Sequence, residues 1–444
     1  MSFSQKLFLR GAIWTVGTYS LSVVVRFFTN VGLSRLVPPE IFGIGLIVVT
    51  LRNGIELVFD AGIGQNIVQN PAGDTRAFRD TAWTIQFFRC LFLYGLLTLL
   101  AGPLTDFYEL PRGAIQLAAV TFIFSSVSSL SLYVLQRRLQ FARFNLFELA
   151  MDVVGAVAIL TLTYFSPTIW SFLIAGVIGT AVRVAGTYLM PDARSWFAWN
   201  KDYVREILSF GKWIYLSSLL AFACASFDKL FLGQYIPFAV LGVYGLARNM
   251  AELPSALFAR IGYSLLFPLV SAHQSGARHE LRGRLASVRI KLLGLCALAL
   301  AFGAAFADVF INIVYDSRYH DAGWMLAPML VGTWFAILCT TNDYALLGTG
   351  RALYGAAGNV AKLITLVVAT PLALGAFGLI GAIAVVGGSE LARYVPILVG
   401  QRREGLSFLI QDIACTLLLL AALAAITALR YEAGFGTVFA GMHF

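Results

Sequence analysis

The sequence predicts an all-α, polytopic integral membrane protein of two pseudo-symmetric six-helix lobes with an additional C-terminal helix. The first observation behind this prediction is composition. Of the 444 residues, 59% are hydrophobic and 12% are charged, and the mean hydropathy is +0.79. A soluble domain carries about 25% charged residues, so most of this chain's surface is expected to face lipid. The second observation is an internal repeat, and the third is the distribution of Lys and Arg between the loops.

The predicted helices follow the apolar runs, because about 20 apolar residues cross the hydrocarbon core of a membrane. The first run follows Lys6 and Arg10 and is too long for the core of a signal peptide, so it is interpreted as the first span. The predicted spans are 12–36, 41–69, 81–104, 112–136, 146–165, 168–190, 207–235, 240–270, 288–315, 322–349, 353–374, 378–399 and 408–429.

Loop charge predicts the orientation. One side of the membrane receives most Lys and Arg of the loops, and the other side receives Arg35, Arg112, Arg318 and Arg430. Because positive charge stays in the cytoplasm, the N-terminus is expected there. The predicted organisation is an N-terminal lobe (1–190), a cytoplasmic linker (191–206), a C-terminal lobe (207–400) and a further span with a tail (401–444). The loops opposite the cytoplasm are too short for a catalytic domain, so we expect no enzyme.

The repeat places similar polar residues in both lobes. Residues 52–57 read Arg-Asn-Gly-Ile-Glu-Leu, and residues 248–253 read Arg-Asn-Met-Ala-Glu-Leu. Upstream, Pro38 and Gly43 correspond to Pro237 and Gly242, with a separation of 199 residues in each pair (237 − 38 and 242 − 43). Internal repeats that place charged residues at mid-membrane depth are typical of transporters.

Charged residues inside the predicted spans form the candidate site, because charge in hydrocarbon is costly and usually functional. The candidates for binding an anionic substrate are Arg26, Arg52, Glu56, Arg248, Glu252 and Arg260. Arg52 and Glu56 share a helix face, and Asp60 is expected one turn further along it. The alternative for each Arg–Glu pair is a structural ion pair between helices. Glu148 and Asp152 are interpreted as structural, since they lie near the cytoplasmic end of their span.

The sequence gives little indication of a metal, redox or nucleic-acid site. The five cysteines lie in apolar runs without a CxxC pair, so we expect buried hydrophobic side chains, no metal site and no cofactor. The basic residues are scattered in short loops without interleaved aromatic residues, which argues against nucleic acid as a partner.

Several segments resemble Wzx-type O-antigen flippases and polysaccharide exporters. They are 36–43 (Leu-Val-Pro-Pro-Glu-Ile-Phe-Gly), 60–65, 68–69, 210–213, 228–233, 241–247 and 266–271. The resemblance implies the multidrug/oligosaccharidyl-lipid/polysaccharide exporter (MOP) superfamily, whose MATE-like members have two six-helix lobes and work by alternating access. The thirteenth predicted span departs from the simple twelve-helix plan.

The resemblance also implies a substrate and partners. The substrate would be an undecaprenyl-pyrophosphate-linked oligosaccharide, the repeat unit of O-antigen, exopolysaccharide or capsule, moved to the outer leaflet of a bacterial inner membrane. Similar flippases hold the diphosphate with arginines at positions that Arg26, Arg52 and either Arg248 or Arg260 occupy here. Membrane lipids, a polysaccharide polymerase and chain-length proteins would be the other partners.

Coupling to a Na⁺ or H⁺ gradient is a further implication of the resemblance. Asp228 matches the acid that some relatives use for sodium, and Asp60 and Asn359 are the other candidates. The span 353–374 offers Asn359 and Lys362 but no acid, which weighs against a sodium site.

The main alternative is a MATE-type antiporter for drugs or organic cations. Such a pump would exchange protons at Asp60, Asp152, Asp228 or Glu252, and the mid-membrane arginines weigh against it. A membrane glycan polymerase or ligase would need a large outer loop. An ATP-driven pump would need a GxxxxGK[ST] phosphate loop, which the sequence lacks.

Overall fold

The computed structural model describes residues 3–271 and 278–439, and in these ranges it consists of helices without any strand. The chain divides into two compact units. The first unit comprises Met1–Phe222 and Lys229–Gly242, and the second unit comprises Ala223–Asp228 and Val243–Phe444. Each unit has its own buried apolar clusters.

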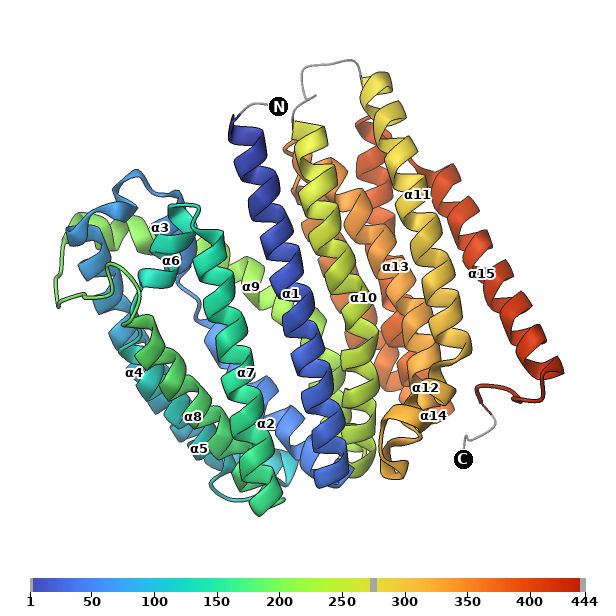
Figure 1. Cartoon of the computed structure of the whole chain (residues 1–444), viewed down its shortest axis with the longest axis horizontal. Helices are drawn as coiled ribbons and strands as arrows, with labels where there is room; N and C mark the ends of the chain where they lie inside the picture. The colour runs from blue at the N-terminus through green and yellow to red at the C-terminus, as the bar shows by residue number, and fades with distance from the viewer. Residues whose placement is uncertain (1–2, 272–277, 440–444) are drawn as a thin grey trace. The chain divides into compact units, whose positions relative to one another are not determined.

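The first unit contains most of the N-terminal helices (Figure 1). They are α1 (Phe3–Leu36), α2 (Pro39–Val58), α3 (Ile63–Gln69), the 3₁₀-helix η1 (Pro71–Asp74), α4 (Arg76–Tyr108), α5 (Ala114–Ser126), α6 (Ser131–Arg137), α7 (Phe141–Phe165), α8 (Ile169–Thr187) and most of α9 (Lys201–Tyr235). In this unit α7 packs on both α1 and α8, and α5 packs on both α4 and α8. Residues 191–200 have no helix, and α9 begins inside the predicted linker 191–206, whose limits stay a prediction.

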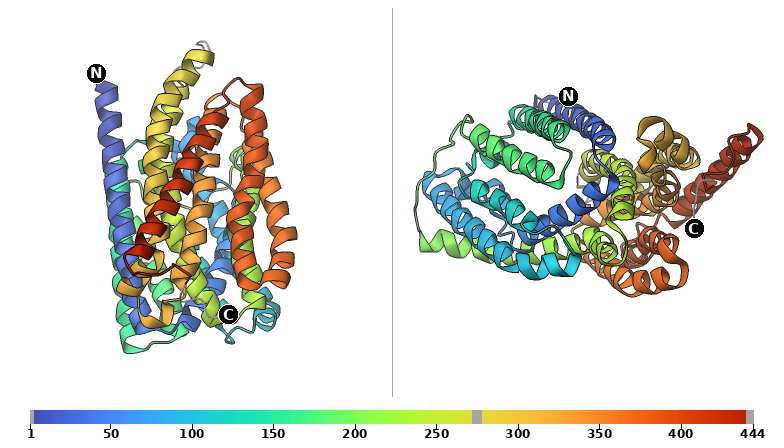
Figure 2. Two further views of the ribbon diagram at one scale, coloured as in Figure 1. Left: turned by 90° about the vertical axis from the view of Figure 1, so that its right-hand side faces the viewer. Right: turned by 90° about the horizontal axis from the view of Figure 1, so that it is seen from below.

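The second unit contains the remaining helices. They are most of α10 (Phe238–Ser271), α11 (Arg278–Ala305), α12 (Ala307–Val314), the 3₁₀-helix η2 (Ser317–Tyr319), α13 (Ala322–Gly348), α14 (Leu353–Arg403) and α15 (Leu409–Glu432). Figure 2 shows α15 beside α11, and α13 packs along α14. Gly378 has φ 62° and ψ −154°, so α14 is two helices joined at a sharp turn, as the separate predicted spans 353–374 and 378–399 require.

The predicted all-α, multi-pass fold is confirmed. Nine helices in the described ranges are long and apolar enough to cross a membrane, and α5 with α6 makes a tenth as a pair bent by 62°. The predicted span 112–136 is therefore broken, and Phe306 interrupts the predicted span 288–315 between α11 and α12. At the α5–α6 bend the side chains of Trp83 and Gln86 donate hydrogen bonds to the carbonyl of Ser128, which replace the lost helical bonds.

The predicted span 41–69 was wrong as a single helix. The helix α2 ends at Val58, and α3 starts only at Ile63. Gly62 lies in the left-handed region (φ 62°), and its amide donates a hydrogen bond to the carboxylate of Asp60 at 3.0 Å. This local turn competes with the helix, because Asp side chains readily bond to backbone amides two residues further on. Asp60 therefore does not lie one turn beyond Glu56 on α2.

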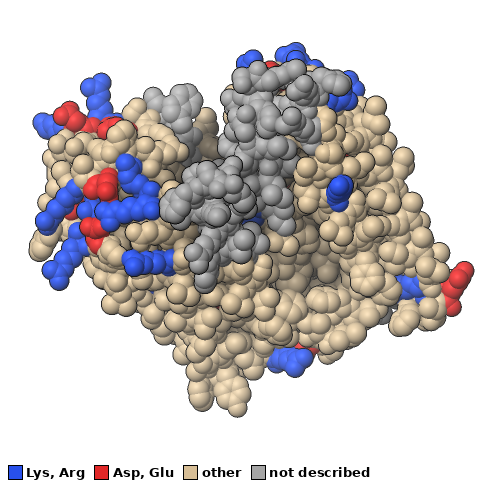
Figure 3. Space-filling model, turned by 45° about the horizontal axis from the view of Figure 1, so that its top comes forward, with Lys and Arg blue, Asp and Glu red and all other residues tan. Residues whose placement is uncertain are grey.

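Charged side chains gather at one end of the first unit (Figure 3). Arg138 pairs with Asp74 and Asp192 at 2.9 and 2.6 Å, and Arg79 also lies 3.5 Å from Asp192. Hydrogen bonds from Arg138 hold the pKa of the Asp192 carboxyl below its ordinary value. The 3₁₀-helix η1, the start of α4, the end of α6 and the loop after α8 supply these residues, and all four lie on the side predicted to be cytoplasmic.

The repeat glycines make a reciprocal contact within the first unit. A Cβ atom on Gly43 would lie 2.0 Å from the carbonyl oxygen of Phe238, and one on Gly242 would lie 1.9 Å from that of Pro39. Phe238 and Pro39 are themselves 199 residues apart (238 − 39), so the two contacts are equivalents under the repeat. The first turns of α2 and α10 thus touch through their backbones, which only glycine allows.

We predict that Gly43→Ala lowers the stability of the protein by about 2 kcal/mol, because the new methyl group can fit only if a backbone moves. The measurement is the apparent Tm of the purified protein in detergent, which should fall by a few degrees. The matched control is Gly95→Ala in α4, where no atom lies within 4 Å of the added Cβ. This control should keep or raise the Tm, since Ala is the better helix former. Equal Tm values for both variants would contradict the tight contact.

Candidate functional site

Arg52 and Glu56 form an ion pair on α2, as the sequence predicted from their spacing. Arg52 Nη1 lies 2.5 Å from a Glu56 carboxylate oxygen, and Nη1 also donates to the side chain of Asn53 at 2.9 Å. The neighbouring helix α5 fixes the guanidinium. Arg52 Nε donates to Thr121 Oγ1 at 3.1 Å, and the group lies over the ring of Phe122 at 4.7 Å. Arg52 is therefore held in place, while its Nη2 has no hydrogen-bond partner among the described residues.

Arg26 on α1 has a partner that the sequence did not reveal. Its guanidinium donates to both carboxylate oxygens of Asp152 on α7, with the shortest contact at 3.0 Å. The side chain of Arg26 is 63% exposed, whereas that of Asp152 is 20% exposed. The two residues are 126 positions apart, so no local pattern indicates the pair. Asp152 thus joins α7 to α1, while most of the Arg26 side chain remains accessible.

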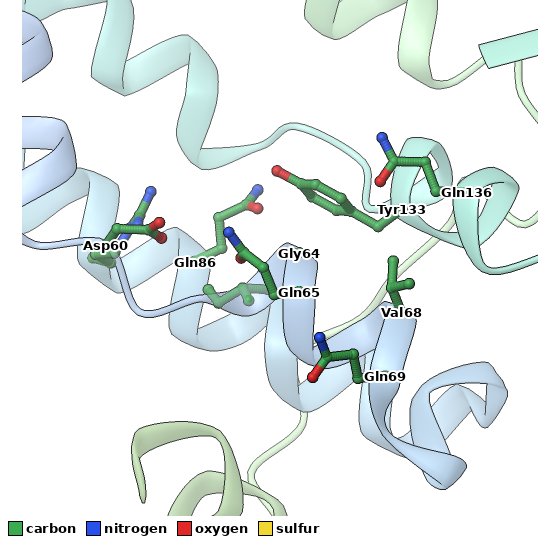
Figure 4. Close-up of a pocket in the computed structure, with 10 residues that line it drawn as sticks. Asp60, Gly64, Gln65, Val68, Gln69, Gln86, Tyr133 and Gln136 are labelled. Carbon is green, nitrogen blue, oxygen red and sulfur yellow. The ribbon is translucent and has the colours of Figure 1, made fainter. Parts of the chain in front are cut away.

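Asp60 pairs with Arg89 of α4 instead of sharing a face with the Arg52–Glu56 pair. Arg89 Nη1 lies 3.3 Å from the carboxylate of Asp60 and donates to the carbonyl of Phe59 at the same distance. These bonds join α4 to the break between α2 and α3. Beside them lies a polar cavity of about 320 Å³, which sequence reasoning did not find (Figure 4). Its residues come from the break, α3, α4 and α6.

The second unit contains a buried cluster around Asp228. Arg248 Nε lies 3.1 Å from Asp228 and 3.3 Å from Glu252, and the hydroxyl of Tyr244 also donates to Asp228. The side chain of Asp228 is only 2% exposed and that of Arg248 only 16%. The structure thus brings together three predicted site residues, and it assigns Asp228 to Arg248 in addition to the predicted Arg248–Glu252 pair. Burial of this kind requires charge pairing, because an isolated ion in apolar surroundings is very costly.

The remaining candidates are more dispersed. Arg260 is an exposed residue of α10. The backbone carbonyl of Asn359 accepts a hydrogen bond from the thiol of Cys224, which lies one turn before Asp228 on α9. No group of His, Cys, Asp and Glu in the described ranges has the arrangement of a metal site.

A further charged cluster lies within α14 and was not predicted. Glu390 accepts from Lys362 at 2.5 Å and from Arg393 at 3.4 Å, and its side chain is 9% exposed. Lys362 and Glu390 stand on the two arms of α14, before and after Gly378. The ion pair therefore joins the two arms. A spacing of 28 residues across a turn gives no periodic signal in the sequence.

The sequence matches the family of polysaccharide biosynthesis proteins over residues 32–323. The chain belongs to this family. The teichuronic acid biosynthesis protein TuaB of Bacillus subtilis is 22% identical over 303 residues, 67% of this chain and 62% of TuaB. The succinoglycan biosynthesis transport protein ExoT of Rhizobium meliloti is 19% identical over 350 residues, 78% of this chain and 70% of ExoT. The chain thus spans 62% and 70% of the lengths of these two relatives.

Solved structures place this family member in a known fold. The lipid II flippase MurJ in an inward closed conformation has a TM-score of 0.64 at 11% identity, over 98% of each chain. An inward-facing MATE multidrug resistance transporter of the MOP superfamily has a TM-score of 0.65 at 16% identity, over 90% of this chain and 98% of the other. The predicted resemblance to polysaccharide exporters is confirmed by the family match and by these relatives, and the solved structures add a shared fold. The protein is a multi-pass membrane protein with a transporter fold.

We predict that Arg248→Ala destabilises the protein by about 3 kcal/mol or more, because it leaves the buried Asp228 without its cation. Adding Asp228→Asn should restore most of the loss, since a neutral amide tolerates burial far better than a lone carboxylate. Protein abundance in the membrane and the Tm in detergent measure both effects. A double variant no more stable than Arg248→Ala would show that the ion pair is not the source of the loss.

Proposed function

We propose that the protein flips a polyprenyl-pyrophosphate-linked oligosaccharide from the cytoplasmic to the outer leaflet of a bacterial inner membrane. The observation that carries the proposal is the recurrence of an arginine in both halves of the repeat, Arg52 and Arg248, in a chain that belongs to the polysaccharide biosynthesis family. ExoT is named as a transport protein and MurJ as a lipid II flippase, which supports the lipid-linked class of substrate. The chain acts as a transporter in this proposal and not as an enzyme.

The physical reason for arginines is the charge of the substrate. A pyrophosphate cannot cross hydrocarbon without partners, because an unpaired buried charge is prohibitive. Arginine suits phosphate, since its planar guanidinium donates two parallel hydrogen bonds. The polyprenyl tail stays in lipid, so no covalent chemistry is needed.

Arg52 and Arg26 are the arginines best placed for this role in the first unit. Arg52 is fixed by Thr121 and Phe122 and keeps Nη2 for a phosphate oxygen. Arg26 is 63% exposed although it is paired with Asp152. In the second unit Arg248 corresponds to Arg52 in the repeat and is paired with Asp228 and Glu252, and Arg260 is exposed. Glu56 and Glu252 would hold the arginine side chains in position.

The contacts of the acids weigh against the drug or cation antiporter. Asp60, Asp152, Asp228 and Glu252 are the acids that such a pump would use, and each is paired with an arginine. A carboxylate whose charge is already balanced attracts a cationic drug weakly.

The proposal includes an orientation and partners. Loop charge supports a cytoplasmic N-terminus. The resemblance to polysaccharide exporters supports assembly with a polysaccharide polymerase and chain-length proteins.

We predict that Arg52→Ala abolishes surface polysaccharide when it replaces the wild-type gene in the source bacterium. Glu56 is 36% exposed, so it tolerates the loss of its partner, and the membrane abundance should stay close to that of wild type. Arg112→Ala, an exposed arginine between α4 and α5, is the matched control and should leave the polysaccharide unchanged. Normal polysaccharide in the Arg52→Ala strain would refute the assignment. Resistance to cationic compounds, lost with the gene, would favour the antiporter.

We predict that Asp228→Asn weakens any coupling to a Na⁺ or H⁺ gradient, because it removes the buried carboxylate that the coupling ion would share with Arg248. The test is flipping into membrane vesicles with an imposed Na⁺ or H⁺ gradient. Wild type should respond to one gradient, whereas Asp228→Asn should flip at the same rate with and without it. An equal gradient response in both proteins would exclude Asp228 from coupling and leave Asp60 and Asn359 as the candidates.

A further inference from the structure

The polar cavity of the first unit has the size of a site for a small ligand. Its volume of about 320 Å³ lies at the lower end of the range of roughly 300–1,000 Å³ for ligand pockets. Three short structural elements form it: the break at Asp60, the helix α3 and the helix α6, with α4 behind them. A cavity of this size accepts a part of a ligand, such as one sugar ring.

Four glutamines line the cavity, and they are its most informative feature. They are Gln65 and Gln69 on α3, Gln86 on α4 and Gln136 on α6. Figure 4 shows Gln65, Gln86 and Tyr133 directed into the same space. Gln86 is held by its amide nitrogen, which donates to the carbonyls of Ser125 and Ser128, so its side-chain oxygen is not used in these bonds.

The side-chain amides of the other three glutamines take no part in the hydrogen bonding of the described residues. The structure gives the side chains of Gln65, Gln69 and Gln136 no hydrogen bond to any described residue, although all three line the cavity. A carboxamide can both donate and accept, and it therefore matches a hydroxyl group, which does the same. Several carboxamides around one cavity suit a ligand with several hydroxyl groups.

The charges of the cavity cancel. Asp60 and Arg89 are its charged residues, and they are paired with each other at 3.3 Å. An anion such as a phosphate would have to compete with Asp60 for Arg89, and a cation would have to compete with Arg89 for Asp60. The chemistry of the cavity consequently favours a neutral ligand.

Tyr133 gives the cavity an aromatic wall. A Cβ on Gly64 would lie 2.3 Å from the Tyr133 ring, so the ring packs directly on the backbone of α3. Arg137, one turn further along α6, donates to the carbonyls of Ile67 and Val68 and so ties α6 to the end of α3. An aromatic face beside polar amides is suited to a sugar ring, which has an apolar face and a polar rim.

We propose that this cavity is the binding site for a neutral sugar of the transported glycan, separate from the arginines that hold the pyrophosphate. This inference rests on the proposed flippase function. The spacing along α2 is consistent with a sugar site in this cavity. Val58, at the end of α2, lies about 9 Å along the helix axis from Arg52. A pyrophosphate at Arg52 would place the first sugars of the glycan beside the break between α2 and α3. Arg52 would thus recognise the shared lipid phosphate, and the glutamines the glycan.

The test compares two lipids on the purified full-length protein by native mass spectrometry. One is the lipid-linked glycan that accumulates in a strain lacking the gene, and the other is undecaprenyl pyrophosphate without a glycan. Wild type should bind the lipid-linked glycan at least about tenfold more tightly. Gln65→Leu combined with Gln136→Leu should lower that affinity about tenfold, as expected for two lost hydrogen bonds, and should leave undecaprenyl pyrophosphate binding unchanged. Neither substitution removes a side-chain hydrogen bond to a described residue, so both variants are expected to fold.

Gln116→Leu is the matched control, because this exposed glutamine of α5 lies outside the cavity. It should bind both lipids as wild type does. If wild type binds neither lipid, or if no lipid-linked glycan accumulates, the proposed function fails, and this inference fails with it. If wild type binds both lipids equally well, or if the glutamine variant changes neither affinity or both by the same factor, the sugar site is refuted while the flippase proposal stands.

Discussion

The pairing of charge inside an apolar chain is the constraint on which the rest of this structure depends. An ion that leaves water without a partner costs many kcal/mol, so each charged side chain deep in a helix needs an opposite charge. The first unit meets this need across helices, with α1 joined to α7 by Arg26–Asp152 and α7 joined to α8 by Glu148–Arg183. The main role of these ion pairs is to stabilise the packing of the helices that they join. An arginine can serve the substrate only where its pair leaves a donor atom uncommitted, as at Arg52 Nη2.

The same constraint explains how the additional C-terminal helix joins its unit. Asp412 of α15 accepts from Arg289 of α11 and from Asn342 of α13, and all three side chains are almost fully buried. At the other end of α15, Arg430 donates to both carboxylate oxygens of Asp308 on α12. Removing one member of such a pair would strand a buried charge, so α15 is bound into the second unit at both ends and is not a loose appendage.

The sequence predicted the helices well, because apolar length is a local property that membrane insertion requires. It also predicted the Arg52–Glu56 and Arg248–Glu252 pairs, since positions four apart meet on one helix face. It missed the break at Asp60, where one Asp-Ala-Gly turn overrides an otherwise continuous apolar run. The sequence could not predict three other ion pairs, because tertiary packing brings their partners together without any periodic signal. They are Arg26–Asp152, Asp228–Arg248 and Lys362–Glu390.

The break at Asp60 connects these observations with function. A continuous helix from 41 to 69 would extend α2 straight past α4, and the glutamines of α3 would follow the face of α2. The turn instead sets α3 against α6 and opens a cavity whose charges cancel. A transporter of lipid-linked glycans meets one phosphate chemistry in every substrate and different sugars in each. A fixed arginine on α2 and a neutral, amide-lined cavity beyond its end would divide these two tasks between neighbouring parts of one unit.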